Sequence, residues 1–318
     1  MNIVDSAPIL KAAQPKPLGF FRKRIWRDRH YYLLIFPGLL FFLIFRYIPM
    51  LGLIIAFKDY NPFQGIMKSD WVGFQHFQTI FSDPEVAHVL MNTLVLSFLQ
   101  ILFAFPAPLI IALLLNEVRN QVFKRSIQSV VYVPHFLSWV VVISMVILML
   151  KNEGMINHYL QQWFGIEPIP FLTNTSYFYP LVIGEVIWKE VGWGTILFLA
   201  ALSGVNLELY EAAIVDGANR WKQLWHVTMP AIRGTVIIML ILRIGSVLDS
   251  GFEQIFLMLN PFNMEVGSVL DTFVYFKGIK QSDFSFATAV GLFKGLVGLV
   301  LVMGANRTAK KFGEDGLY

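Results

Sequence analysis

One loop of the sequence carries residue types and spacings that suit the binding of another protein. Residues 204–235 read GVNLELYEAAIVDGANRWKQLWHVTMPAIRGT. Ala212 and Ala213 would give a helix a low-relief face, and Glu211 beside them offers a carboxylate for a charge-assisted hydrogen bond to a basic partner group. Asp216 and Gly217 follow, and the glycine permits a sharp turn. The pattern predicts recognition of a partner protein, and the alternative is an ordinary amphipathic loop helix.

The same loop predicts two short helices joined at the glycine. Asn206 can cap a helix over Leu207–Asp216, and Gly217 suits the position just past its end. A second helix is expected at about Arg220–Val227. Pro230 then opens the next apolar run, because proline is accepted in a first helical turn. The expected shape is a helix, a glycine hinge and a helix, lying along a membrane surface.

A second candidate site consists of charged and aromatic side chains inside apolar runs. Ionisable groups are costly in hydrocarbon and usually face the interior of a helix bundle. Aromatic rings stack on the apolar faces of sugars while polar groups bond their hydroxyls, so a sugar-contacting cavity is predicted. The candidate residues are Glu185, Trp188, Lys189, Trp193, Arg243, Asp249, Phe252, Glu253 and Lys294. The three basic residues in this set would favour an acidic sugar unless the carboxylates neutralise them.

Sequence spacing predicts how some of these residues are arranged. Glu185 and Lys189 are four residues apart, so they share a helix face and can pair. Asp249 and Glu253 have the same spacing, with Phe252 between them. The alternative is that the charges form structural pairs between helices and that the tryptophans belong to an interfacial belt.

Several kinds of chemistry are excluded or disfavoured by what the sequence lacks. There is no cysteine, which excludes disulfides, thiolate zinc sites and cysteine nucleophiles. No GxxxxGK[ST] phosphate loop occurs, so ATP hydrolysis would have to come from another polypeptide. The histidines are scattered without metal-ligand spacing, which disfavours a metal site or a histidine-based catalytic site: His30, His76, His88, His135, His158 and His226.

The composition places these sites in a membrane protein. Of 318 residues, 56% are hydrophobic and only 14% are charged, and the mean hydropathy is +0.60. A soluble domain has about 25% charged residues. The net charge of +4 does not indicate nucleic-acid binding, because the basic residues lie mostly at the ends of apolar runs.

Six apolar runs are long enough to cross a bilayer, which needs about 20 residues for each helix. Backbone groups find no water in hydrocarbon, so the runs are expected to be helical, with kinks at several prolines. The first thirty residues precede a run that is too long for a cleaved signal peptide, and this run is expected to be retained. The predicted spans are about Tyr31–Phe57, Leu90–Leu115, Val130–Leu150, Phe178–Ser203, Ala231–Leu259 and Phe284–Ala305.

The distribution of Lys and Arg predicts the orientation. Most of these residues lie in the N-terminal segment, in 116–129, in 204–235 and near the C-terminus. The positive-inside rule therefore places both termini and the 204–235 loop in the cytoplasm. Residues 18–29 mix aromatic and basic residues, so they form either a short surface helix or an ordinary basic flank. The opposite flanks contain only Lys58, Lys68, Lys151, Lys277 and Lys280.

The loop at 204–235 resembles the EAA loop of binding-protein-dependent ABC transporter permeases. That family pattern is E-A-A, three residues, G, nine residues, I, any residue, L-P. Glu211, Ala212, Ala213, Gly217 and Pro230 match it at the same spacing. Valine and methionine replace the isoleucine and the leucine, and both replacements remain apolar. In the family this loop docks into a cleft of the cytoplasmic ATPase and transmits its closure to the spans.

The resemblance extends over nearly the whole chain after residue 30. The segments PGLLFFLIFRYIPMLGLIIAFKDYNPF, WVGFQHFQTIF and WKEVGWGTILFLAALSGV are similar to permeases for sugars and oligosaccharides. GFEQIF and ATAVGLFKGLVGLVLVMGAN are similar to the subgroup that imports polysaccharide fragments, in a maltose-permease-like group. The resemblance implies a second homologous permease subunit, two ATPase subunits that hold ATP and Mg²⁺, and an extracytoplasmic solute-binding protein.

These inferences predict an all-α integral membrane protein of six transmembrane helices, with a cytoplasmic coupling loop (204–230) between the fourth and the fifth. The expected divisions are a basic segment at 1–30, one permease domain at 31–308 and a tail at 309–318. The resemblance implies the bacterial cytoplasmic membrane and an oligosaccharide substrate, with no cofactor bound by this chain. The alternatives are an ABC permease for another solute, such as a glycerol phosphate or an amino acid, an ion-gradient-driven transporter and an integral membrane enzyme.

Overall fold

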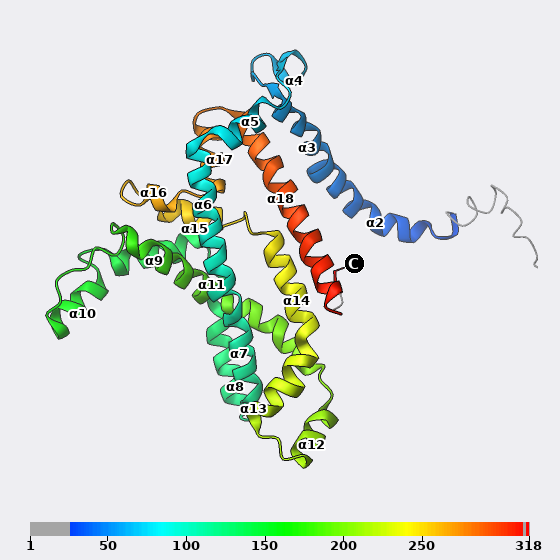
Figure 1. Ribbon diagram of the computed structural model, residues 1–318, viewed down its shortest axis with the longest axis vertical. Coiled ribbons are helices and arrows are strands. Elements are labelled where there is room, and N and C mark those ends of the chain that lie inside the picture. Colours follow the sequence, from blue (N-terminus) through cyan, green and yellow to red (C-terminus); the bar gives the residue numbers. More distant parts are fainter. Residues whose placement is uncertain (1–25, 314–315, 318) are drawn as a thin grey trace, which may run out of the picture. The chain divides into compact units, whose positions relative to one another are not determined.

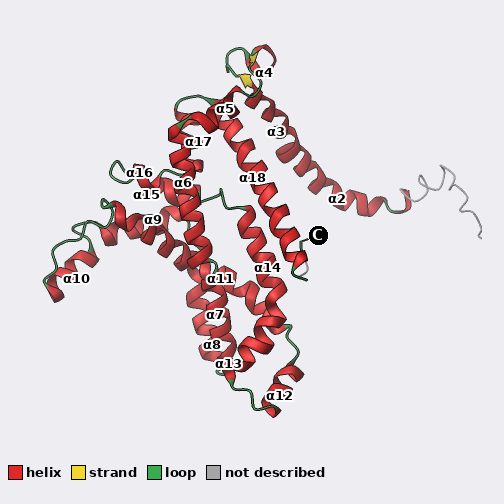
Figure 2. Ribbon diagram, in the orientation of Figure 1, coloured by secondary structure: helices red, strands yellow, loops and turns green. Residues whose placement is uncertain are grey.

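The computed structural model describes residues 26–313 and 316–317, so most of the surface helix considered at 18–29 lies outside them. The described chain is almost entirely helical (Figure 2), and its strands are the antiparallel pair β1 (Lys58–Asp59) and β2 (Asp70–Trp71). Six helical runs among these residues are long and apolar enough to cross a membrane, which agrees with the predicted fold class. The chain divides into two compact units, one up to Ile54 and one from Ile55 onward.

The first unit contains most of the first helical run. α2 (Arg29–Phe42) is followed by a π-helical turn, η1 (Leu43–Tyr47), and by α3 (Ile48–Met50). The run ends in a 3-10 segment, η2 (Leu51–Phe57), so it spans Arg29–Phe57 and is close to the prediction. None of the residues in α2, η1 or α3 is buried, and the charged Arg46 lies exposed in η1.

The second and sixth runs are longer than their apolar cores predict. The second comprises α6 (Pro84–Leu99), the π turn η3 (Gln100–Ala104) and α7 (Pro106–Glu117), and the side chain of Asp83 caps its start. The sixth is a single helix, α18 (Phe284–Lys311), capped by the side chain of Asp283. Capping side chains and charged residues extend a membrane helix past its apolar segment, and a count of apolar residues does not detect this extension.

The third predicted span is wrong at its start. α8 (Gln121–Tyr132) ends before a 3-10 turn at η4 (Val133–Phe136) that contains Pro134, and α9 (Trp139–Leu150) begins afresh. Proline cannot donate a helical hydrogen bond, and the hydroxyl of Ser138 accepts one from the Val141 N–H, which caps the new helix. The run continues to α10 (Met155–Phe164). The fourth helix, α11 (Phe178–Ser203), has the predicted limits.

The fifth predicted span is wrong at both ends. α13 (Arg220–Gln223), the π turn η6 (Leu224–Thr228) and α14 (Met229–Gly245) follow one another without a break. The run stops at Gly245, and residues 246–251 are not helical because serine, aspartate and glycine favour other conformations there. Gly251 has a φ of 87°, which a residue with a side chain rarely adopts. α15 (Phe252–Met258) is therefore a separate helix.

Short elements connect these runs. The loop from β1 to α6 contains α4 (Gly65–Lys68) and α5 (Gln75–Ser82), and η5 (Thr175–Tyr177) precedes α11. The connection from α11 to α13 contains α12 (Leu207–Val215). Between α15 and α18 lie α16 (Met264–Gly267), α17 (Leu270–Tyr275) and the π turn η7 (Phe276–Lys280).

Three of the π turns lie just before a proline. η1 ends two residues before Pro49, η3 two residues before Pro106 and η6 two residues before Pro230. A proline ring clashes with the carbonyl four residues earlier, and proline has no N–H to bond it. A wider turn at that point moves the carbonyl aside, so these helices pass through their prolines without ending.

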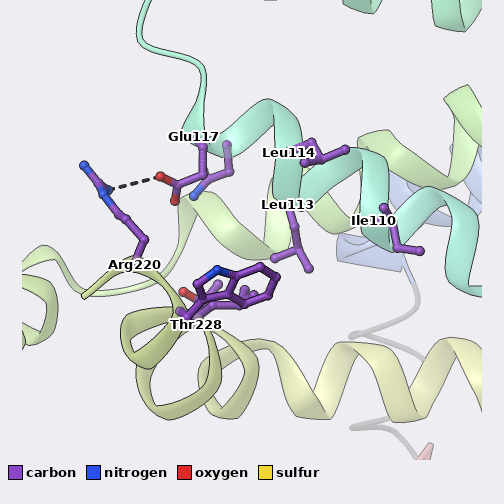
Figure 3. A pocket seen from close by; sticks show the side chains of 9 residues that line it. Ile110, Leu113, Leu114, Glu117, Arg220 and Thr228 are labelled. Carbon is purple, nitrogen blue, oxygen red and sulfur yellow. Dashed lines mark hydrogen bonds and ion pairs between the residues drawn. The ribbon is translucent and has the colours of Figure 1, made fainter. Parts of the chain in front are cut away.

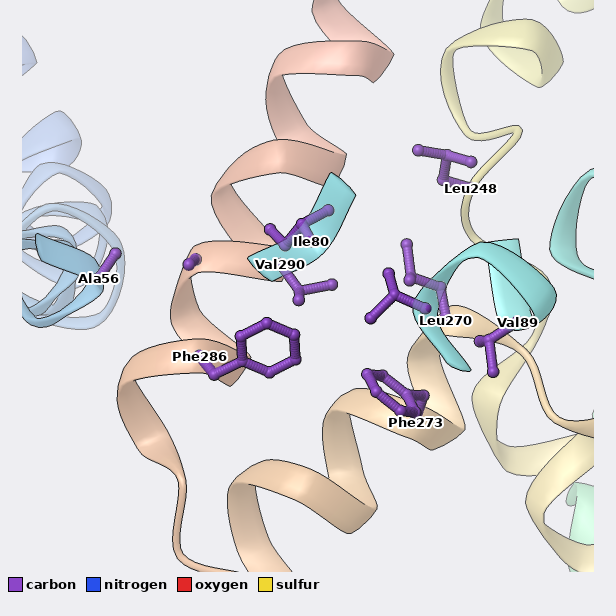
Figure 4. Close-up of a cluster of buried hydrophobic side chains, with 10 residues drawn as sticks. Ala56, Ile80, Val89, Leu248, Leu270, Phe273, Phe286 and Val290 are labelled. Atoms are coloured by element: carbon purple, nitrogen blue, oxygen red, sulfur yellow. The ribbon is translucent and has the colours of Figure 1, made fainter. Parts of the chain in front are cut away.

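The second unit is held together by buried apolar clusters rather than by one continuous core. The largest lies where α5, α6, α17 and α18 meet, and Figure 4 shows Phe273, Phe286, Leu270 and Val290 pointing toward one another within it. A second cluster joins α6, α9, α11 and α15, and a third joins α7, α11 and α14.

Close helix contacts in this unit depend on glycine. α14 lies beside α18 (Figure 1), and a Cβ atom added at Gly298 would meet the Gly245 carbonyl oxygen at 2.8 Å. Gly192 of α11 approaches the Val131 carbonyl oxygen of α8, where an added Cβ would lie at only 2.2 Å. Small residues allow membrane helices to approach closely, and the candidate site residues on α11 and α18 are positioned by these contacts.

Candidate functional site

The EAA loop, residues 204–235, has most of the predicted local structure. α12 is capped by Asn206, whose side-chain oxygen accepts from the Glu208 N–H at 3.0 Å. The helix ends at Val215, and Gly217 has the positive φ (73°) expected of a residue just past a helix end. Pro230 occupies the first turn of α14, but the helical run already begins at Arg220, so the prediction that Pro230 opens the fifth span is wrong.

Most of the surface of α12 is left open by the described part of the chain. None of its residues is buried, and its apolar side chains Leu207, Ile214 and Val215 are exposed. Glu211, Ala212, Asp216 and Gly217 are exposed and Ala213 is half-buried. Within residues 26–313, the Glu211 carboxylate has no hydrogen-bond or ion-pair partner. An open helix with apolar residues around a free carboxylate is suited to covering by another protein.

The middle of α11 forms an ionic and aromatic cluster with the segment that precedes α9. The Lys189 amine, which is 5% exposed, donates to the His135 carbonyl oxygen at 2.7 Å and lies 3.4 Å from the Glu190 carboxylate. Glu190 also contacts His135 Nδ1 at 2.8 Å. The His135 ring stacks on Trp193 with centroids 4.8 Å apart. Lys189 therefore pairs with Glu190, and the predicted pairing of Lys189 with Glu185 does not form.

Glu185 has a different partner, and its environment is mostly apolar. Its Oε2 accepts from the Gln254 amide of α15 at 2.7 Å, while its Oε1 is buried without a hydrogen bond. Trp188 lies on the same cavity of about 240 Å³ between α9 and α11. Gln254 also donates to the Val182 carbonyl oxygen at 2.9 Å, so this one amide attaches α15 to α11.

The break after α14 carries a second ionic cluster. The Lys294 amine of α18 lies 2.5 Å from Asp249 in the break and also contacts Asp271 of α17. Asp249 is not helical, so the predicted helix face shared by Asp249 and Glu253 does not exist. Asp271 and Lys294 are largely buried whereas Asp249 is mostly exposed, so the cluster has a closed end and an open end.

The remaining candidates are divided between two places. Arg243, at the end of α14, donates to the Gln100 side chain in the π turn of the second span. Phe252 stacks on Phe256 with centroids 5.3 Å apart, and both rings contact Tyr275 of α17. Glu253 is exposed beside them, without a partner among the described residues. The fourth to sixth spans thus supply polar groups centred on Lys189, Lys294 and Arg243, and Asp249 of the Lys294 cluster also interacts electrostatically with Arg243.

Sequence reasoning missed several members of these groups. His135 and Trp139, which lies 5.3 Å from the Lys189 amine, are brought in by the break around Pro134. A proline followed by a histidine in an apolar run is a signal for such a break. Gln254 and Asp271 gave no signal, since their partners are distant in sequence. Among the described residues, no group of three His, Asp or Glu side chains is placed to hold a metal ion.

The helical runs define a multi-pass membrane component, and the exposed surface of α12 is of a kind that suits covering by another protein. The family model for the binding-protein-dependent transport system inner membrane component matches residues 104–311, and the chain belongs to that family. Members of this family are transport components, so the chain is a transport subunit of an ABC importer and not a catalytic one. The resemblance of the chain to binding-protein-dependent ABC transporter permeases is thereby confirmed.

Individual relatives cover nearly the whole chain. Protein LplB of Bacillus subtilis is 55% identical over 92% of both chains. The polygalacturonan/rhamnogalacturonan transport system permease protein YteP of the same species is 50% identical over 93% of this chain and 92% of its own length. The arabinooligosaccharides permease AraP of that species is 27% identical over 92% of this chain and 94% of its own length.

A solved structure has the same fold. It is a bacterial alginate ABC transporter in complex with an alginate pentasaccharide-bound periplasmic protein. One of its chains aligns with a TM-score of 0.85 and 38% identity, covering 93% of this chain and 99% of that one. A second structure, of a bacterial ABC transporter that imports the acidic polysaccharide alginate, aligns with the same TM-score at 39% identity.

Proposed function

We propose that this chain is one of two homologous permease subunits of an ABC importer for an oligosaccharide or polysaccharide fragment. An extracytoplasmic solute-binding protein delivers the sugar, and two separate ATPase subunits supply ATP hydrolysis. The observation that best supports a sugar as the substrate is the cluster at Lys189, where a tryptophan and a histidine ring lie beside a lysine and a carboxylate. Such a cluster matches a sugar, which has apolar faces and many hydroxyls.

The EAA loop is the docking site for an ATPase subunit in this proposal. The open surface of α12 and the Glu211 carboxylate, which has no partner among the described residues, support that role, because a basic group on the ATPase would gain a strong hydrogen bond there. The sequence has no phosphate loop, so ATP and Mg²⁺ belong to the partner. Both chain ends and the loop then lie in the cytoplasm, with the chain in the bacterial inner membrane, as the distribution of Lys and Arg favours.

The transport cycle follows from two conformations that different ligands stabilise. ATP closes the ATPase dimer, α12 carries that movement into the spans, and the cavity opens to the outside to accept the sugar. Hydrolysis resets the ATPase, and the cavity opens inward. A shift between the two states needs only that ATP and the loaded binding protein bind one state more tightly than the other.

An acidic sugar is the favoured substrate within this class. Two of the similar proteins handle polygalacturonan or alginate, which are acidic, and Arg243 donates to a neutral amide rather than to a carboxylate. The other two basic candidates form close ion pairs with carboxylates, whereas Arg243 interacts with Asp249 only at longer range, so Arg243 is the cation we propose for a uronate group.

The test is uptake by the complete importer in proteoliposomes, with ATP inside and the loaded binding protein outside. Radiolabelled oligogalacturonide should accumulate only when ATP is present, and its carboxyl-reduced counterpart should compete much more weakly. Equal competition would refute the preference for an acidic sugar but would not contradict the import of a sugar. Accumulation driven by an ion gradient without ATP would refute the ABC assignment for this system, and uptake of a glycerol phosphate or an amino acid instead would refute the sugar.

A further inference from the structure

A chain of hydrogen bonds closes the EAA loop around its glycine corner. The Tyr210 hydroxyl of α12 lies 2.9 Å from the Thr228 hydroxyl of η6. Thr228 in turn donates to the Gln223 carbonyl oxygen at 3.4 Å. The Gln223 amide donates to the Ala218 carbonyl oxygen at 2.9 Å, just past Gly217. Either hydroxyl can donate in the Tyr210–Thr228 bond, which joins α12 directly to η6.

These bonds differ from the ion pair on the other side of the loop. Arg220 contacts Glu117 of α7 at 3.1 Å beside a cavity of about 330 Å³ that Thr228 also lines (Figure 3). Both charged side chains are more than half exposed, so water and salt weaken that pair. Thr228 and Gln223 are only 5% and 7% exposed, so water competes little for their hydrogen bonds.

We propose that Tyr210 is a positioning residue that fixes α12 to the start of the fifth span, so that the loop and α14 move as one rigid lever. Gly217 is then a fixed corner and not a hinge. A free hinge would let α12 follow the ATPase without moving α14, so the closure of the ATPase would not be transmitted to the spans. The Tyr210–Thr228 bond prevents that, because it joins the two arms of the corner directly. This inference rests on the proposed ATPase docking, and it identifies the bond through which closure of the ATPase reaches the fifth span.

The rigidity can be measured by spin labelling in the assembled importer. The chain has no cysteine, so Val215→Cys and Ala231→Cys, both at exposed positions on the two arms, give its only label sites. A rigid lever predicts one narrow distance distribution between the labels that is the same without nucleotide and with ATP bound. Adding Tyr210→Phe should broaden it. A distance that changes with ATP in the otherwise unaltered chain would show a hinge and overturn the inference.

A second readout is the amount of sugar imported per ATP hydrolysed. Tyr210→Phe and Thr228→Val should each lower this ratio severalfold while the ATPase subunits remain bound, and the double variant should be no worse than either. Thr228→Ser keeps the hydroxyl and should import as much sugar per ATP as the unaltered chain. Tyr159→Phe is the matched control, since that ring lies on α10 away from the loop.

The two proposals fail in different ways in this experiment. If the unaltered importer shows no ATP-coupled uptake, the proposed function is overturned. If it shows coupled uptake and Tyr210→Phe has the same import ratio and the same narrow distance distribution, only the lever is overturned.

Discussion

At the scale of single residues, the Lys294 amine neutralises one carboxylate that is largely buried and another that is mostly exposed. Asp271 and Lys294 are 20% and 17% exposed, whereas Asp249 is 62% exposed. A buried carboxylate that loses its partner is costly because neither water nor another charge replaces it. The Asp249 carboxylate is mostly uncovered by this chain, so it depends less on the Lys294 amine than Asp271 does.

Removal of the Lys294 amine should therefore lower the stability of the protein, and a second substitution should restore most of it. We expect Lys294→Met to destabilise the protein by up to about 3 kcal/mol, because Asp271 is left unpaired. Adding Asp271→Asn should recover most of the loss, while Asp249→Asn alone should change little. Thermal unfolding of the detergent-purified importer measures all three, and a double variant no more stable than Lys294→Met would contradict this account.

The carboxylate of Glu211 is predicted to act only in the assembled importer. Because it has no partner in this chain among residues 26–313, Glu211→Arg should leave the spans folded and reverse the charge offered to the ATPase. Sugar uptake should fall at least tenfold, with ATP hydrolysis uncoupled from it. Glu167→Arg, at an exposed carboxylate in another loop, is the control. Unchanged uptake in Glu211→Arg would argue against docking.

At the scale of elements, the contact of α14 with α18 depends on the lack of side chains at its centre. Gly298→Val would press a side chain against the Gly245 backbone, so we expect poor folding and early aggregation on heating. Gly304→Val on the same helix has open space around the new side chain and should behave like the parent. Fluorescence-detected size-exclusion chromatography after heating compares the two, and equal behaviour would refute close packing as the constraint.

Hydropathy and local signals predicted elements well where nothing interrupts a run. The limits of α11 agree with the prediction, and the caps and corner of the EAA loop follow from Asn206 and Gly217. The third and fifth spans were misplaced because Pro134 and the Ser–Gly segment at 246–251 break runs whose mean hydropathy favours one continuous helix. The pairings of Lys189 with Glu190 and of Lys294 with Asp271 were missed, since tertiary packing selects them over partners at helical spacing.

At the scale of the whole molecule, the orientation across the bilayer remains a proposal with a direct test. With both termini inside, trypsin added to inside-out vesicles should cut at Arg220 or Lys222 in the EAA loop, and both residues are exposed. Trypsin added to right-side-out vesicles should cut instead at Lys68 or Lys151, which are exposed on the opposite flanks. Antibodies to tagged termini identify the fragments, and the reverse pattern would invert the topology.

The same digestion reports on assembly. Bound ATPase subunits should protect the EAA loop in inside-out vesicles, because α12 exposes an apolar surface that a partner would cover. Glu211→Arg should remove the protection, while cleavage at Arg307 and Lys310 near the C-terminus serves as the reference. Protection that is the same with and without the ATPase would mean that something else covers the loop.

The π turns before the prolines also set the phase of the spans. Each wide turn holds about one residue more than an α-helical turn, and one residue corresponds to about 100° of rotation. Deleting a single residue from η3 would therefore turn the face of α7 away from α11 while α6 stayed in place. The inserted residue therefore sets which side chains of α7 face the same direction as those of α6. A helical wheel drawn through all of Pro84–Glu117 ignores this rotation, so it would assign the side chains of one half to the wrong neighbouring helix.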